Sequence, residues 1–187
     1  MKIISSLNFL KIIAVLILGS EIFGFFYFEN SIILLMLVIL LGLVGLWQLR
    51  RNPEILAMLM LYLGLDDFYN VRYGLAVPMA TILIAVFFLA LFLTYLLMRI
   101  YKYEEILEKS TSSTYLLTSG LVVLEIFLAM SLWPVDPKTK SLVIVIVFYL
   151  MNKLIYLNIN RVLNLKRASG FIIVSIIILA SVISLGW

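Results

Sequence analysis

The chain of 187 residues contains neither cysteine nor histidine. Without cysteine no disulfide can form, so the redox compartment cannot be inferred from the sequence. Without histidine, a histidine-ligated haem, a histidine-based zinc site and a Ser-His-Asp triad are all excluded. Charged residues are scarce, at 13% of the chain, and the net charge is only +4. This small excess requires no nucleic-acid partner, and we expect none.

Apolar residues make up 65% of the chain, whereas a soluble globular domain has roughly 45–50%. Continuous apolar runs of about 20 residues are typical of transmembrane helices, because about 30 Å of hydrocarbon at 1.5 Å per residue requires that length. A membrane β-barrel would alternate apolar and polar residues instead. The sequence therefore predicts an all-α polytopic transmembrane helix bundle with almost no mass outside the membrane.

Six spans are evident in the sequence, and a seventh is ambiguous. The ambiguous segment is Pro53–Val71, whose uninterrupted apolar part, Ile55–Leu65, has 11 residues and so covers only about 16 Å as a helix. Length alone favours an interfacial or re-entrant helix there, which leaves six spans plus one such helix as the alternative architecture. The six evident spans are Leu10–Phe28, Ser31–Leu49, Leu75–Met98, Tyr115–Trp133, Ser141–Leu157 and Ser169–Trp187.

The distribution of positive charge favours seven spans. Loops on the cytoplasmic side normally carry an excess of lysine and arginine. With six spans the charges outside the spans divide six against six, and with seven they divide nine against three. The nine are Lys2, Arg50, Arg51, Arg99, Lys102, Lys109, Arg161, Lys166 and Arg167, and the three are Arg72, Lys138 and Lys140. We predict seven spans in the cytoplasmic membrane of a prokaryote, with the N-terminus inside and the C-terminus outside.

The stretch "LGLDDFYNVRYG" places two adjacent aspartates, Asp66 and Asp67, near the outer end of the short third span. We interpret them as a polar stop signal among the outer headgroups, with Arg72 as a counter-ion and a turn at Asn70 and Gly74. The rival hypothesis is a metal-dependent intramembrane lipid enzyme, because paired aspartates bind Mg²⁺ in enzymes that act on pyrophosphates. Such sites gather more carboxylates than this stretch offers, so we expect no metal and no other cofactor.

Three charged residues stand out inside the six evident spans, namely Glu21, Glu125 and Lys153. Lys11 also lies in a span, but near its start, where a lysine side chain can reach the inner interface. Buried charges in a bilayer are costly, so each of the three is a candidate functional residue. Together with the polar neighbours of Lys153 they form the predicted intramembrane polar cluster. Its members are Glu21, Glu125, Tyr149, Asn152, Lys153 and Tyr156.

Lys153 belongs to a polar stripe. Tyr149, Asn152, Lys153 and Tyr156 recur at intervals of three and four residues, which places them on one helical face. The loop before this span is short, so the two flanking spans should be antiparallel neighbours. Glu125 and Lys153 lie at similar depths from that loop, and we predict that they interact, either to hold the bundle together or to form a proton or ion path.

The tripeptide Glu-Ile-Phe occurs at 21–23 and again at 125–127. In the seven-span arrangement both copies lie in helices that run in the same direction. This favours a 3+1+3 organisation of a single domain, over residues 1–71, 72–109 and 114–187, as in some small transporters.

The stretch "EIFLAMSLWPVDPKTKSLVIVIVFYLMNKL", Glu125 to Leu154, combines a mid-span glutamate, an aromatic-proline turn and a following helix with a tyrosine. In this pattern it resembles uncharacterised multi-span membrane proteins of candidate-phyla bacteria. The resemblance covers about a sixth of the chain and implies no activity.

No catalytic constellation is recognisable in the sequence. The first hypothesis is therefore a non-enzymatic accessory or scaffold membrane subunit, whose partners are membrane lipids and other membrane protein subunits. The second is a small transporter, or a proton- or ion-coupled carrier, that uses Glu21, Glu125 and Lys153. The third is the metal-dependent lipid enzyme that would use Asp66 and Asp67.

Overall fold

A computed structural model of the protein describes residues 2–29, 32–48, 52–103, 106, 109–160 and 165–185. These residues form seven α-helices and no strand, which confirms the predicted all-α bundle. The predicted span ends at Ser31, Leu49 and Trp187 lie outside the described residues. The helices are α1 (Lys2–Phe28), α2 (Ile32–Gln48), α3 (Pro53–Leu75), α4 (Met79–Ile100), α5 (Lys109–Ser131), α6 (Pro137–Ile159) and α7 (Leu165–Leu185).

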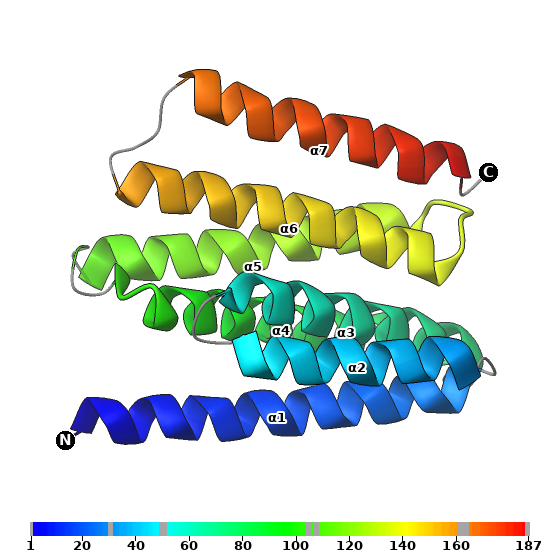
Figure 1. Ribbon diagram of the computed structural model, residues 1–187. Coiled ribbons are helices and arrows are strands. Elements are labelled where there is room, and N and C mark those ends of the chain that lie inside the picture. The colour runs from blue at the N-terminus through cyan, green and yellow to red at the C-terminus, as the bar shows by residue number, and fades with distance from the viewer. Residues whose placement is uncertain are drawn as a thin grey trace.

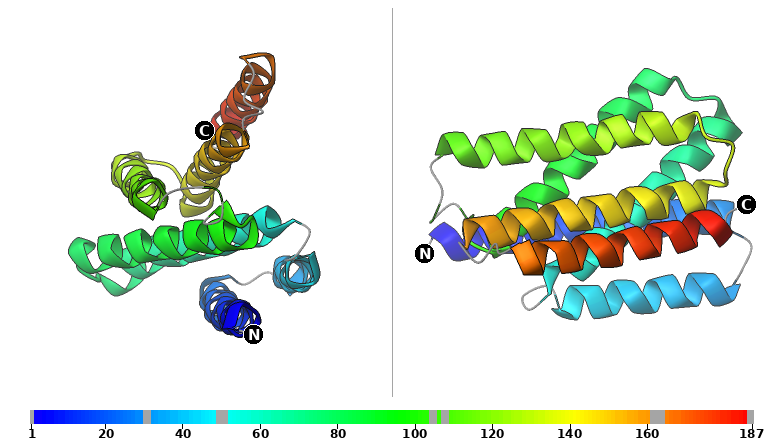
Figure 2. Two further views of the ribbon diagram at one scale, coloured as in Figure 1. Left: turned by 90° about the vertical axis from the view of Figure 1, so that its left-hand side faces the viewer. Right: turned by 90° about the horizontal axis from the view of Figure 1, so that it is seen from above.

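Successive helices run in opposite directions along the bundle, so α1 begins at one end and α7 finishes at the other (Figure 1). In the end-on view, α3 and α4 pass through the middle, with α1 and α2 on one side and α5 and α6 on the other (Figure 2). Helix α7 lies at the edge beside α6. The ambiguous segment therefore belongs to one continuous helix of 23 residues, Pro53–Leu75, which is longer than its apolar part alone.

Helix α3 is the central helix of the bundle, because it packs against α1, α2, α4 and α6. Leucine and methionine fill most of its contact surface, and close contacts between such side chains stabilise the packing by dispersion. Its fully buried apolar side chains are Leu56, Ala57, Met60, Leu61, Leu63, Leu65 and Tyr69.

The C-terminal end of α3 differs from the prediction, and the N-terminal end does not. Pro53 occupies the first turn, as expected from its missing N–H. However, Asn70 and Gly74 lie within the helix rather than in a turn. The chain leaves the helix at Ala76, which adopts a left-handed conformation with φ 51°, shortly before Pro78. Because a proline disfavours helical geometry in the residue before it, the turn forms next to Pro78 and not at the glycine.

Among the described residues, three helices are long and apolar enough to cross a membrane, namely Met79–Ile100, Thr111–Ser131 and Pro137–Ile159. Shorter apolar helical stretches occur at Ile12–Phe28, Met36–Trp47 and Ala168–Val182. Large apolar side chains also cover the outside of the bundle. Phe23 is 71% exposed, Ile33 82% and Trp47 78%. An apolar surface of this extent is unusual for a soluble monomer and is consistent with a membrane protein.

Candidate functional site

The first group of polar side chains lies where α3 begins. The Lys153 Nζ of α6 donates to both carboxylate oxygens of Glu54 on α3, at 3.2 and 3.4 Å. The Tyr101 hydroxyl, just after α4, donates to Glu54 Oε1 at 2.9 Å. Lys153 Nζ also lies 5.2 Å from the centroid of the Tyr156 ring. One carboxylate thus joins three helices.

A cluster of tyrosines surrounds this ion pair. The Tyr101 ring lies 5.6 Å from the Tyr103 ring and 5.1 Å from the Tyr156 ring, measured between centroids. Burial, reinforced by the neighbouring phenols and Glu54, raises the pKa of Tyr103 well above its usual value. The shift leaves Tyr103 neutral at physiological pH, as an ordinary tyrosine is, so it serves the cluster as a packing or hydrogen-bonding group.

The predicted partner of Lys153 is wrong. Lys153 pairs with Glu54, whereas Glu125 is exposed on α5. The reason is that α6 packs against α3 as well as α5, and the first turn of α3 lies level with Lys153. The sequence interpretation missed Glu54 because an acidic residue next to Pro53 suits a helix N-terminus without any partner. The sequence feature that could have revealed the pair is a glutamate within the ambiguous third span, where an acid needs a partner if the segment is buried.

The predicted polar cluster is only partly assembled. Tyr149, Lys153 and Tyr156 lie near Glu54, as a polar stripe on α6 should. Asn152 donates instead to the Phe148 carbonyl oxygen of its own helix, at 2.9 Å. Glu21 and Glu125 lie on other helices, in different surroundings.

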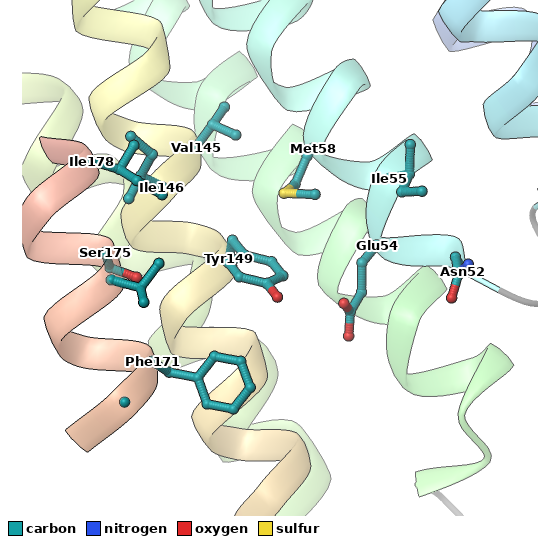
Figure 3. Close-up of a pocket in the computed structure, with 12 residues that line it drawn as sticks. Asn52, Glu54, Ile55, Met58, Val145, Ile146, Tyr149, Phe171, Ser175 and Ile178 are labelled. Carbon is teal, nitrogen blue, oxygen red and sulfur yellow. The ribbon is translucent and has the colours of Figure 1, made fainter. Parts of the chain in front are cut away.

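A groove of about 790 Å³ opens between α3, α6 and α7. Figure 3 shows Glu54 of α3 and Tyr149 of α6 pointing toward each other, with Phe171, Ser175 and Ile178 of α7 along the opposite wall. Helix α7 packs mainly against α6, which leaves the groove open at its side. The described lining of the groove is mostly apolar, and its one charged residue is Glu54.

The opposite end of α6 also contacts α3 through a lysine. Lys140 is only 3% exposed. Its Nζ donates to the Tyr73 hydroxyl at 3.3 Å and lies 5.4 Å from the ring centroids of both Tyr69 and Tyr73. The ammonium is therefore held by a hydrogen bond and two cation–π contacts. Helices α3 and α6 are joined by a lysine near each end.

The two aspartates are not a headgroup stop signal. Asp66 is 2% exposed and Asp67 9%, and both lie inside α3. Arg72 does not act as their counter-ion, because its Nη1 donates to Met79 Sδ at 2.9 Å. The physical reason is that α3 continues to Leu75 and is enclosed by its neighbours, so positions expected among headgroups are covered by protein.

Asp67 and Glu21 form a second group, which the sequence interpretation did not bring together. A Cβ added to Gly24 on α1 would lie 2.4 Å from Asp67 Oδ2, and one added to Gly64 on α3 would lie 2.8 Å from Glu21 Oε1. Each carboxylate thus occupies space that a glycine of the other helix leaves open. One sequence feature could have indicated this contact: each acid has a glycine three residues away on the same helical face, in Glu21–Gly24 and in Gly64–Asp67.

Asp66 faces a third place, a cleft of about 250 Å³ at the α6 N-terminus. Its Oδ2 accepts a hydrogen bond from Asn70 at 3.2 Å. In the same cleft Lys138 forms an ion pair with Glu29, and Asp136 caps α6 by accepting from the Thr139 N–H at 2.9 Å. Burial alone would raise the pKa of Asp136, but the hydrogen bonds from Thr139 and from the backbone of Lys138 and Asp136 together outweigh burial and lower it.

The described residues contain no group of three or more carboxylate, histidine or cysteine side chains placed to hold a metal ion. The chain matches no protein-family model, no curated protein and no solved structure. The resemblance of Glu125–Leu154 to multi-span proteins of candidate-phyla bacteria therefore stays a prediction, as does the 3+1+3 organisation.

We predict a measurable coupling between Glu54 and Lys153. Each single change, Glu54→Gln or Lys153→Met, should destabilise the bundle because it leaves a half-buried charge unpaired. The double variant should lose less than the two losses combined, with a coupling free energy of about 0.5–2 kcal/mol. The free energy of unfolding in detergent is measured for the unaltered chain, both single variants and the double variant. As a control, the same cycle with Glu125→Gln in place of Glu54→Gln should show no coupling. A coupling with Glu125 instead of Glu54 contradicts the assigned pair.

Proposed function

We propose that the chain is an integral membrane protein with seven spans that acts as a non-enzymatic accessory subunit. It lies in the cytoplasmic membrane of a prokaryote, with its N-terminus inside. Three apolar helices of sufficient length, the exposed apolar side chains and the excess of positive charge at one end support this proposal. Its partners are membrane lipids, for which the groove beside α7 is suited, and at least one other membrane protein subunit.

The observation that carries the proposal is the position of Glu125. It lies in the C-terminal half of α5, near the middle of the predicted span Tyr115–Trp133, and its side chain is exposed. A charged residue facing hydrocarbon at mid-span costs at least about 2.5–3.5 kcal/mol on insertion scales. The chain would not place such a group there unless something covers it. A basic or amide side chain on a helix of another subunit would remove that cost.

The surface around Glu125 has the form of a helix-docking face. Leu117, Leu121 and Leu128 are 50%, 49% and 39% exposed. With Glu125 they follow one another at intervals of three and four residues, so they form a single stripe along α5. Polar side chains can hydrogen-bond across the contact between membrane helices, so Glu125 is the group in this stripe that would fix the register of a partner helix.

The carrier hypothesis based on Glu21, Glu125 and Lys153 has less support. Those three side chains lie on α1, α5 and α6, and each has different neighbours: Glu21 faces Gly64, Lys153 faces Glu54 and Glu125 faces outward. They offer no shared site in which a substrate could contact all three. The lipid-enzyme hypothesis loses its paired metal ligands in the same way, because Asp66 and Asp67 face different cavities.

The topology prediction concerns α3. Because the chain has no cysteine, single cysteines can be labelled without a background. We expect a membrane-impermeant maleimide to label Ala76→Cys from outside intact cells and Asn52→Cys only after the membrane is permeabilised. Both positions are exposed and flank α3. Labelling of both from the same side contradicts seven crossings and the nine-to-three charge distribution that rests on them.

The assembly prediction concerns α5. A photoreactive maleimide attached to Leu121→Cys should give one discrete adduct with another membrane protein when the chain is irradiated in its native membranes. The adduct should disappear when Glu125→Leu is added, because the polar contact that fixes register is lost. Ile177→Cys on α7, 58% exposed, is the matched control and should give no discrete adduct. Adducts that are the same from both positions, or that survive Glu125→Leu, contradict the proposal.

A further inference from the structure

A cavity of about 560 Å³ lies between α1, α3 and α4, on a different side of α3 from the groove beside α7. Two carboxylates, Glu21 and Asp67, form its polar part. The remainder is mostly apolar, and three of the lining residues are phenylalanines: Phe68, Phe88 and Phe92. The cavity thus combines two acids with an aromatic wall.

The two acids are buried and incompletely satisfied. Glu21 is 6% exposed and Asp67 9%. Within the described part of the chain, Glu21 Oε2 and Asp67 Oδ1 have no hydrogen-bond partner. The described lining also contains no lysine or arginine. A buried carboxylate without a positive or donating partner is costly, so both free oxygens are suited to a ligand that brings positive charge.

The volume and lining argue against a metal ion as that ligand. Magnesium requires about six oxygen ligands at 2.0–2.1 Å, and calcium six to eight. Here only Ser20 adds a further hydroxyl to the two carboxylates, and its hydroxyl already donates to the Ile17 carbonyl oxygen at 2.7 Å. A space of this size instead falls within the range for organic ligands. Aromatic faces stabilise organic cations without demanding defined coordination geometry.

The cavity is accessible from the surface of the bundle. Phe88 is 63% exposed at its edge, and Ser20 is exposed on the facing side of α1. In the proposed bilayer this mouth opens into hydrocarbon, so a ligand that dissolves in lipid can reach it laterally. We propose that the cavity binds a lipophilic organic cation, held by the carboxylates of Glu21 and Asp67 and by the phenylalanine wall. The site does not depend on assembly through α5.

The test uses two probes of nearly the same size and shape but opposite charge. Equilibrium dialysis of the purified full chain in detergent micelles, with protein-free micelles as the blank, should show saturable binding of tetraphenylphosphonium. Tetraphenylborate should show none, because the carboxylates repel it. The double variant Glu21→Gln with Asp67→Asn should bind the phosphonium at least about tenfold more weakly, which corresponds to losing one good ionic contact. Glu125→Gln, which removes an acid outside the cavity, should bind it as the unaltered chain does.

A second variant keeps the test decisive if the double change disturbs folding. Phe88→Leu removes one aromatic face from a side chain that is 63% exposed, so it should leave the fold intact and weaken phosphonium binding about threefold or more. Phe9→Leu, also on a side chain 63% exposed but outside the cavity lining, is the matched control and should have no effect. Equal binding of both probes, or phosphonium affinity unchanged by Phe88→Leu and by the double variant, overturns the proposal.

Discussion

The presence of three carboxylates on one helix, two of them buried and one half-buried, is the constraint on which the rest of the structure depends. Glu54, Asp66 and Asp67 all belong to α3, and in a bilayer none of them can face hydrocarbon at low cost. Helix α3 therefore has to be surrounded by protein, and it contacts four other helices. Glu54 meets Lys153 of α6, while Asp67 meets Gly24 of α1. The polar groups thus determine which helices lie next to α3 and which face of α3 each of them contacts.

A helix whose side chains are almost all apolar does not need to be surrounded by protein. Helix α7 carries a run of isoleucines that are largely exposed and packs mainly against α6. Apolar side chains gain little by leaving lipid for protein, so such a helix can remain at the edge and leave a groove beside it. Glu125 on α5 is the exception, a charge on an exposed face. Because an exposed charge in the membrane is costly, we propose that a partner covers this face of α5.

Hydropathy and charge counting predicted the number of helices and their approximate limits, including α3, because both depend only on position along the chain. They could not predict the rotation of a helix about its axis or its neighbours. For that reason Asp66 and Asp67 were expected among headgroups but are buried, and Lys153 was assigned to Glu125 although it pairs with Glu54. The polar stripe around Lys153 was predicted better, since the period of a helix is fixed.

The most direct test of a central, buried α3 is a disulfide between Gly24→Cys on α1 and Asp67→Cys on α3. The two Cβ atoms would lie about 4 Å apart or less, because Asp67 Cγ is 2.7 Å from a Cβ built on Gly24 and one C–C bond adds about 1.5 Å. This separation suits a disulfide. We predict rapid cross-linking on mild oxidation in membranes, and none for Gly19→Cys with Asp67→Cys, since Gly19 faces open space. Absence of the first cross-link, or equal formation of both, would contradict the central position of α3.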